Sequence, residues 1–265
     1  RKMKTVGLSA TPIVNNLIEG RSILELLSGK NWDEDVKVQM TTSNAMKLHQ
    51  KFSLMSLKEE PKYTLPKIEE VIVVAPIPKN CKITNLNHDR LAIEQYCTKA
   101  RIPEIIKRIK GKTIIYTEFV KGNVPNMPYI LDMLKTAVTD AGYKCEIHTG
   151  ENHFGKDRFI KNENIQVLIA SQTLGTGVDG LQKVCHNIIF NNLPWTHAQY
   201  AQVVGRLIRK KQKSKVSVFY CVERLSDFMG VVCDETSMFL HFRWAQDYKQ
   251  RIRINHKNNI GVWLH

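Results

Sequence analysis

The chain has 265 residues, 43% of them hydrophobic, which is enough to bury a sizeable core. Its formal net charge of +14 favours a polyanionic partner such as nucleic acid, because basic side chains that contact phosphates release counterions. No apolar run approaches the roughly 20 residues of a membrane-spanning helix, and no signal-peptide pattern is visible, so we expect no membrane association.

The six cysteines stand at long and uneven intervals, and none forms a C-x-x-C pair. This spacing argues against a zinc site and a dense disulfide framework, so we expect no metal site. Reduced cysteines in a cytosol-like compartment fit best. Cys185 and His186 are adjacent at the start of an expected strand, where core packing explains them better than a nucleophile or a metal ligand.

The first part of the chain is expected to be mainly helical. Residues 5–9 are short and apolar, which is typical of the end of a strand, and Thr11-Pro12 then begins a new element. Helical patterns follow at residues 15–28, 43–57 and 86–110. We expect Pro103 to interrupt the last of these helices, and residues 71–75 to form a strand.

From residue 113 the pattern changes to short strands that alternate with helices. Apolar strands are expected at residues 113–119, 145–148, 165–170, 187–190 and 216–221. Helices are expected at residues 128–141, 153–162, 197–209 and 234–254. Continuously apolar strands that alternate with helices predict an α/β fold, with a parallel sheet covered on both faces.

Three short patterns resemble known sites but lack the context that those sites need. Residues 111–113 read GKT, yet Ile106 stands where a P-loop needs its first glycine, and a strand follows instead of a helix. Residues 175–180 match G-x-G-x-x-G, but the next strand comes too soon for a crossover helix, which needs at least about 10 residues. The acidic run 33–35 follows no apolar strand, so we interpret it as the solvated start of a helix.

Two segments of small polar residues stand at the ends of expected strands. The first, LSATPIVNNL, covers residues 8–17, where an ordinary helix N-cap is the alternative explanation. The second pairs the strand TIIYTEF with CEIHTG, which puts Thr117, His148, Thr149 and Gly150 at the carboxyl ends of parallel strands. Such sheets bind ligands at these ends, where hydroxyls and backbone amides can hold phosphodiesters.

Two later segments contain glycines, an aspartate and a pair of arginines. In SQTLGTGVDG the glycines allow tight turns and close backbone approach, and the alternative for Asp179 is an ordinary turn residue. In QYAQVVGRLIR the residues Arg206 and Arg209 would share a helix face and could clamp a phosphoryl group. The alternative is a solvated basic face. However, Gly205 inside the expected helix costs about 1 kcal/mol relative to alanine, which argues against a purely structural role.

In this order, the four segments resemble the third to sixth motifs of superfamily 2 helicases and translocases. The NNL after the first segment is similar to the SWI/SNF branch and differs from the DEAD-box RNA helicases. The resemblance covers about residues 8–28 and, with gaps, about residues 65–222. It implies the RecA-like C-terminal lobe of such a motor, with a parallel sheet flanked by helices, a helical N-terminal linker and a C-terminal helix.

The resemblance also implies a role for the polar groups of these segments. The nucleotide site would be coupled to the grip on nucleic acid by Ser9, Ala10 and Thr11. The nucleic-acid backbone would be contacted by Thr117, His148, Thr149, Gly150 and Thr173. ATP would be bound by Gly177, Asp179, Arg206 and Arg209. Catalysis would use Gln202, Arg206 and Arg209, with an arginine finger that stabilises the charge developing in phosphoryl transfer.

By the same resemblance, ATP and Mg²⁺ would bind between this lobe and an N-terminal RecA-like lobe of the same full-length chain. That other lobe would supply the P-loop and the DExx carboxylates, which we do not find in these 265 residues. The abrupt start at residues 1–4 is typical of a piece of a longer chain, and we expect this piece alone not to hydrolyse ATP. The expected partner is double-stranded DNA. The alternatives are an RNA helicase lobe and a non-catalytic nucleic-acid-binding or scaffold module.

The SWI/SNF branch usually ends its last motif in His-Arg-Ile-Gly-Gln, whereas this chain has LIRKKQ at residues 207–212. This difference favours a viral, phage or bacterial relative and a cytoplasmic location, or a nuclear one if the source is eukaryotic. The expected organisation is the end of the first motor lobe, a helical linker, the RecA-like lobe and a helical extension. These parts are assigned to residues 1–28, 29–85, 86–225 and 226–265.

Overall fold

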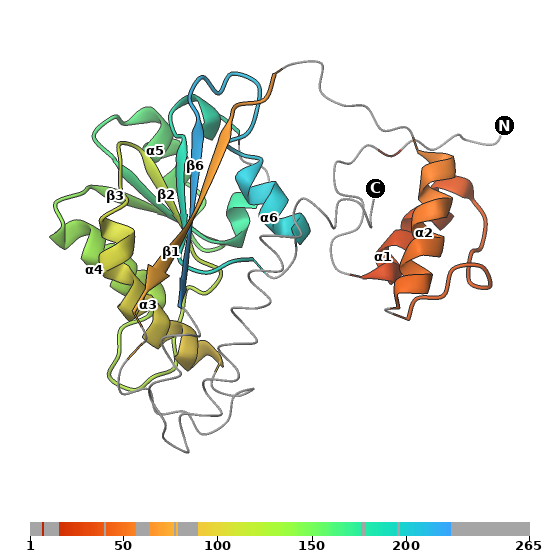
Figure 1. Ribbon diagram of the computed structural model, residues 1–265, viewed down its shortest axis with the longest axis horizontal. Helices are drawn as coiled ribbons and strands as arrows, with labels where there is room; N and C mark the ends of the chain where they lie inside the picture. Colours follow the sequence, from red (N-terminus) through yellow and green to blue (C-terminus); the bar gives the residue numbers. More distant parts are fainter. Residues whose placement is uncertain are drawn as a thin grey trace. The chain divides into compact units, whose positions relative to one another are not determined.

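A computed structural model of the chain describes residues 7, 16–39, 41–56, 64–76, 78, 90–175, 179–194 and 197–223. The chain forms two compact units (Figure 1). The first contains residues 1–62, 196–199 and 251–265, and the second contains residues 63–195 and 200–250. The predictions for Ser9, Ala10, Thr11 and Gly177, and for the helix at 234–254, lie outside the described residues.

Two helices that pack against each other, α1 (Leu17–Ser28) and α2 (Thr42–Met55), form the described part of the first unit. Asn16 caps α1 by accepting the backbone N–H of Glu19 at 3.1 Å, as a short polar residue does at a helix start. The core of this unit consists of Leu17, Leu24, Val36 and Leu48. One core therefore spans the predicted boundary at residue 28.

The acidic run 33–35 lies in the turn between α1 and α2, so the prediction of a helix start at this point was wrong. Trp32 holds the turn, because its indole N–H donates to the Ser28 hydroxyl at 2.9 Å. Asp33 then pairs with the guanidinium of Arg21 at 2.7 Å. These contacts with α1 direct the chain into a turn before a new helix can start.

A six-stranded parallel sheet forms the centre of the second unit, in the order β1-β6-β5-β2-β4-β3 (Figure 1). The strands are β1 (Ile68–Ala75), β2 (Thr113–Tyr116), β3 (Cys145–His148), β4 (Val167–Ala170), β5 (Asn187–Phe190) and β6 (Val216–Glu223). Strands β2, β4 and β5 are buried at every residue, which explains their continuously apolar sequences. All strands begin at one edge, called here the amino edge, and end at the opposite carboxyl edge.

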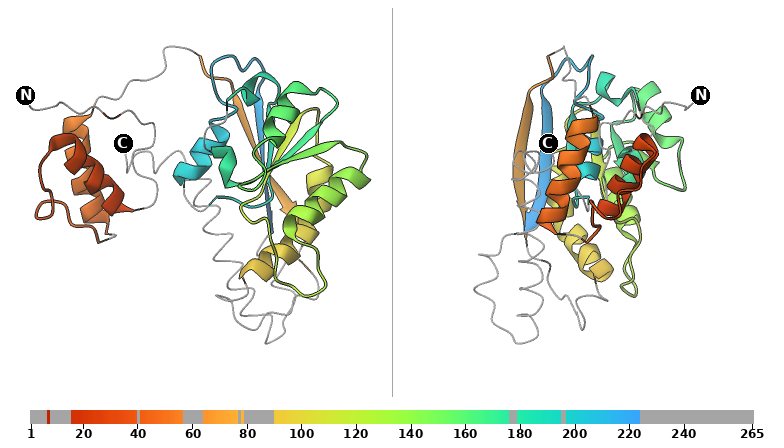
Figure 2. Two further views of the ribbon diagram at one scale, coloured as in Figure 1. Left: turned by 180° about the vertical axis from the view of Figure 1, so that it is seen from behind. Right: turned by 90° about the vertical axis from the view of Figure 1, so that its right-hand side faces the viewer.

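Helices cover both faces of this sheet, as the alternating pattern predicts. On one face α3 (Arg90–Ile106) and α4 (Ile130–Asp140) lie side by side over a core that includes Ile115, Ile169 and Ile189 (Figure 2). On the other face lie α5 (Gly155–Lys161) and α6 (His197–Val204), together with the short 3-10 turns η1 (Gln172–Gly175) and η2 (Leu181–Lys183). The predicted α/β fold, with a parallel sheet covered by helices on both faces, is confirmed.

Helix α3 continues through Pro103, so the predicted interruption was wrong. Proline removes one intrahelical hydrogen bond and usually breaks a helix. Here Ile102, Ile105 and Ile106 on either side of Pro103 pack against the core, and this burial holds the helix together.

Strand β1 belongs to the sheet, although residues 29–85 were assigned to a linker. It pairs in parallel with β6 from Ile68 opposite Val216 to Ala75 opposite Glu223. Its inward-facing Val73 lies in the same core as α3 and α4, so the lobe begins well before residue 86.

The two faces of β1 give a direct test of this boundary. Val73 is 1% exposed and the adjacent Ile72 is 49% exposed. We expect Val73→Ala to lower the free energy of unfolding of the lobe by about 2 kcal/mol, because two buried methyl groups are lost and a cavity remains. Ile72→Thr, which keeps a β-branched side chain, should cost less than about 1 kcal/mol. Urea denaturation of both variants checks this, and equal small losses would exclude β1 from the folded lobe.

Candidate functional site

The arginine pair and the glycine segment, which are separated in sequence, come together beside α6. Arg206 donates from a terminal guanidinium nitrogen to the carbonyl of Gly175. Arg209 donates from Nη1 to the Asp179 carboxylate at 3.1 Å, and its Nε donates to the carbonyl of Gly205 at 2.9 Å. The structure therefore joins both predicted arginines to the glycine segment that contains Asp179.

Gln202 lies at the same place, one helical turn before Arg206. Its side chain is so close to Gly175 that a Cβ added to the glycine would lie 3.5 Å from Gln202 Oε1. Asp179 is also held by the Gln182 amide, which donates at 3.1 Å to the same oxygen, Oδ1, that accepts from Arg209. Sequence reasoning missed Gln182, because a lone glutamine in a short turn carries no distinguishing pattern.

Both arginines follow α6 instead of lying on it, so the prediction of a shared helix face was wrong. The helix ends at Val204, and residues 205–211 form a series of turns and bends. Gly205 begins them, and a Cβ there would lie 2.7 Å from the carbonyl oxygen of Ala201, closer than side chains tolerate. Glycine is thus required by a close backbone approach at the end of the helix, and the turns then direct both guanidiniums to the glycine segment.

The charges of this cluster affect one another. Burial lowers the pKa of Arg206, and the positive charge of Arg209 lowers it further. The pKa of the exposed Asp179 carboxyl is also lowered, first by the Gln182 hydrogen bond, then by the Gly180 N–H and by Arg209. At neutral pH the cluster therefore contains two guanidiniums and one carboxylate.

A tyrosine cluster anchors α6 to the sheet. The hydroxyls of Tyr200 on α6 and Tyr220 on β6 contact each other, and both donate to Glu70 of β1, at 3.0 Å and 2.6 Å. Phe190 stacks on the Tyr220 ring with centroids 5.7 Å apart. The position of the arginine pair thus depends on β1, because Glu70 holds the helix that precedes the pair.

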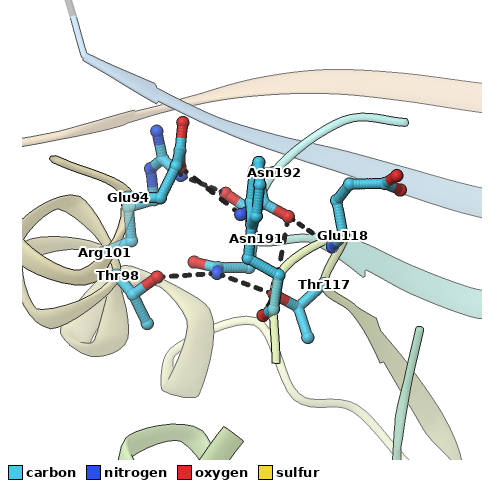
Figure 3. Close-up of polar contacts among 8 residues, drawn as sticks. Glu94, Thr98, Arg101, Thr117, Glu118, Asn191 and Asn192 are labelled. Carbon is cyan, nitrogen blue, oxygen red and sulfur yellow. Dashed lines mark hydrogen bonds and ion pairs between the residues drawn. The ribbon is translucent and has the colours of Figure 1, made fainter. Parts of the chain in front are cut away.

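Thr117 is placed at the carboxyl end of β2, as predicted, but its side chain points inward. It is fully buried, and its hydroxyl donates to the carbonyl of Phe119 at 2.8 Å. The same hydroxyl accepts from the Asn191 amide at 3.3 Å (Figure 3). The Thr117 hydroxyl thus joins β2 to the end of β5, and its contact with a nucleic-acid backbone stays a prediction.

Figure 3 shows the buried polar network that surrounds Thr117 at the carboxyl edge. The guanidinium of Arg101, with no exposed surface, pairs with Glu94 at 3.2 Å and donates to the carbonyl of Asn191 at 2.5 Å. The Asn191 amide donates to the Thr98 hydroxyl at 2.8 Å. The side-chain oxygen Oδ1 of Asn192 accepts the backbone N–H of Glu118 at 2.6 Å. Helix α3 is thereby tied to the ends of β2 and β5.

Sequence reasoning missed this network, although two signals were present. One is the pair Asn191-Asn192 directly after an apolar strand, and the other is an arginine within a helix that faces the core. Glu118 continues the network toward the glycine segment, because its carboxylate accepts from the Gln172 amide and from the Tyr116 hydroxyl. Gln172 immediately precedes the half-buried Thr173, so Glu118 fixes the turn in which that predicted nucleic-acid contact lies.

The remaining predicted contacts lie at the end of β3. His148 is 3% exposed, and burial lowers its pKa, as do the nearby Lys156 and His153. Thr149 is buried in a tight turn whose backbone bonds with Asn152 in both directions, at 3.0 and 3.1 Å. Gly150 is exposed at the tip of that turn. Its backbone is therefore the most accessible of the predicted phosphate contacts on this strand.

Cys185 is a packing residue, as expected. It is buried at the amino edge, away from the carboxyl ends of the strands, and its thiol donates to the Lys112 carbonyl at 3.1 Å. Burial raises its pKa to about 12, so it stays protonated and unreactive.

In the part of the chain that the structure describes, no group of three His, Cys, Asp or Glu is placed to hold a metal ion. No helix of that part is both long and apolar enough to cross a membrane.

Residues 97–211, which contain the arginine pair and most of the buried network, match the model of the helicase conserved C-terminal domain family. Over 128 residues the chain is 27% identical to YqhH of Bacillus subtilis (strain 168), named as an uncharacterized ATP-dependent helicase. That stretch is 48% of this chain and 22% of the relative, so the chain spans a small part of that protein.

Two solved structures are also similar to this chain. One is the C-terminal part of the Fun30 ATPase domain, at 16% identity and a TM-score of 0.41, covering 58% of this chain and 54% of that one. The other is a DEAD box protein from the hyperthermophile Methanococcus jannaschii, at 15% identity and a TM-score of 0.39, covering 69% and 40%.

The buried ion pair of Arg101 and Glu94 should be costly to break and easy to replace. We expect Glu94→Leu to lower the free energy of unfolding by about 3–5 kcal/mol, because the Arg101 guanidinium stays buried without that carboxylate. The double variant Glu94→Leu/Arg101→Met should recover most of this loss, since both charges are then gone. Urea denaturation measures both values. Glu69→Gln, which breaks the exposed pair with Lys215, is the control and should cost less than about 1 kcal/mol.

Recovery in the double variant is the decisive comparison. A double variant that is no more stable than Glu94→Leu would show that Arg101 stabilises the lobe through contacts other than this ion pair.

Proposed function

We propose that this chain is the second motor lobe of an ATP-dependent DNA helicase or translocase of the SWI/SNF type, and that it supplies an arginine finger. The cluster of Arg206, Arg209, Gln202 and Asp179 supports this most strongly. It gathers two guanidiniums beside a glycine turn, within residues that match a helicase C-terminal domain. Two fixed guanidiniums are the groups that stabilise charge in phosphoryl transfer.

The two arginines have different tasks in this proposal. Arg206 is partly buried and bonded to the Gly175 carbonyl, so it positions the glycine turn. The Arg209 side chain is 35% exposed, and its partner Asp179 is 75% exposed. An arriving phosphoryl group can compete with so exposed a carboxylate for Arg209, since a solvated ion pair is weak. Arg209 is therefore the finger, and Asp179 holds it in place until nucleotide binds.

ATP with Mg²⁺ would be shared with a phosphate-binding lobe, because these 265 residues contain no P-loop pattern. The donor set of this chain suits the part of ATP that carries negative charge, since both guanidiniums are cations that present several N–H donors to oxygen. Gln202 and Asp179 would orient the arginines around that charge. Nucleic acid would lie along the carboxyl edge, at the exposed Gly150 and the turn that holds Thr173.

The deciding experiment measures ATP hydrolysis by the full-length motor that contains this chain, with and without double-stranded DNA. We expect DNA to stimulate hydrolysis and Arg209→Ala to lower the stimulated kcat by about 10³-fold or more, the effect of losing an arginine finger. Arg158→Ala removes the same charge from α5, where Arg158 pairs with Glu146, and should leave the rate unchanged. Equal rates for Arg209→Ala and the control would remove Arg209 from the reaction.

The same assay separates the alternatives. Stimulation by RNA and not by DNA would make the protein an RNA helicase. An intact protein that binds nucleic acid without hydrolysing ATP would make this lobe a binding module.

The chain by itself should show no ATP turnover above the buffer rate, because one lobe supplies only part of the phosphate-binding groups. A coupled phosphate-release assay on the purified chain, with and without DNA, checks this. ATPase activity that co-purifies with the folded chain and is lost in Arg209→Ala would contradict the two-lobe arrangement.

A further inference from the structure

The parallel sheet collects lysines at its amino edge, opposite the predicted nucleic-acid contacts. Neighbouring strands of a sheet lie about 4.8 Å apart, so residues that precede adjacent strands form a row. The backbone N–H of Val216 donates to the carbonyl of Lys67 at 2.8 Å, and that of Ser217 donates to the carbonyl of His186 at 2.8 Å. The starts of β1, β6 and β5 therefore stand side by side.

Near the starts of β1, β2, β5 and β6, six exposed lysines have no ion-pair partner in the described part of the chain, namely Lys67, Lys110, Lys183, Lys210, Lys211 and Lys213. They are called here the basic edge. They lie just before β1 and β2, in η2 before β5, and in the loop before β6.

Two acidic groups at this edge pair with basic residues outside this set, while Asp140 and Glu163 precede β3 and β4, at the end of the sheet away from β1. Lys215 pairs with Glu69 at 2.9 Å, and Arg108 pairs with Glu104 at 2.6 Å. Lys112 donates to the carbonyls of Phe159 and Asn162, which lie at the end of α5. The basic edge therefore keeps an unneutralised positive charge in the folded lobe.

The loop before β6 presents its lysines in a fixed conformation. The amide of Gln212 donates to the carbonyl of Cys185 at 2.8 Å, which fastens the loop to the start of β5. Lys211 has a φ of 80°, a left-handed conformation that suits glycine or asparagine far better than lysine. Lys211, which lies between Lys210 and Lys213, therefore adopts a backbone conformation that is unfavourable for lysine.

The two edges of the sheet differ in aromatic content and in the mixture of charges. The acidic Glu151 and Asp157 lie at the carboxyl edge together with Lys121 and Lys156, and so do the exposed rings of Tyr129 and Phe154, just before α4 and α5. The described residues of the amino edge include no exposed Phe, Tyr or Trp ring. The amino edge therefore offers lysines for phosphates, without a large hydrophobic ring on which a base could stack.

We propose that the basic edge is a second nucleic-acid-binding surface, which holds the phosphodiester backbone without reading sequence. Lysines act as point charges on phosphates, and a row of them neutralises successive phosphates along one strand. This surface does not depend on the arginine finger. It extends the contact of the lobe from the carboxyl edge to the opposite side of the sheet.

The test is a salt titration of the binding of the chain to a 20-base-pair DNA duplex of mixed sequence, followed by fluorescence anisotropy. We expect Lys110→Gln/Lys183→Gln/Lys211→Gln to weaken binding and to reduce the slope of log K against log salt by about 0.9 for each phosphate that is no longer neutralised. The control Lys47→Gln/Lys99→Gln/Lys135→Gln removes the same charge from exposed positions on the helices and should keep a steeper slope. Thermal unfolding of both variants verifies that each is folded.

Equal slopes for the two triple variants would overturn the proposal, since binding would then follow net charge alone. Binding of the wild type to phosphatidylserine vesicles but not to the duplex would also overturn it, in favour of a lipid surface. Loss of duplex binding in the amino-edge variant supports the basic edge even if Arg209→Ala leaves hydrolysis unchanged. The two proposals can therefore fail separately.

Discussion

A guanidinium without any exposed surface, that of Arg101, constrains the rest of the lobe. A buried charge must be paired and hydrogen-bonded, and Glu94 together with the Asn191 carbonyl meets that requirement. These groups come from α3 and from the end of β5, so helix and strand must keep one relative position. Such a pair adds little net stability, but leaving it half-formed is costly, which selects a single arrangement of the carboxyl edge.

The arrangement of this edge determines where the glycine-rich and polar turns of the sequence lie. Asn192 holds the end of β2, and Glu118 then holds Gln172 at the start of the glycine segment. From the other face of the sheet, Tyr200 and Glu70 hold α6, which directs Arg206 to Gly175. Two independent anchors therefore converge on one turn, so the guanidiniums can be positioned to within hydrogen-bonding distance without lying on a regular helix.

The distribution of charge gives the two edges of the sheet different chemistry. At the carboxyl edge the polar side chains are largely satisfied within the protein, as for Thr117, and backbone groups such as those of Gly150 remain for a ligand. At the amino edge the lysines of the basic edge stay exposed, without an ion pair among the described residues. A parallel sheet produces this contrast directly, because every loop that enters a strand lies at one edge and every loop that leaves lies at the other.

Sequence alone determined the layers of the lobe, since strands buried on both faces must be apolar throughout, and it singled out Arg206, Arg209, Gln202 and Asp179. Only the tertiary structure decided that α6 stops at Val204, that Pro103 stays within a helix, and that β1 completes the sheet. It also decided that Thr117 faces inward, to Asn191, which is 74 residues away in sequence. The periodicity of apolar residues indicates which face of a helix or strand is buried. It does not indicate which distant polar group will accept a hydrogen bond from a buried donor, because that depends on how whole elements pack.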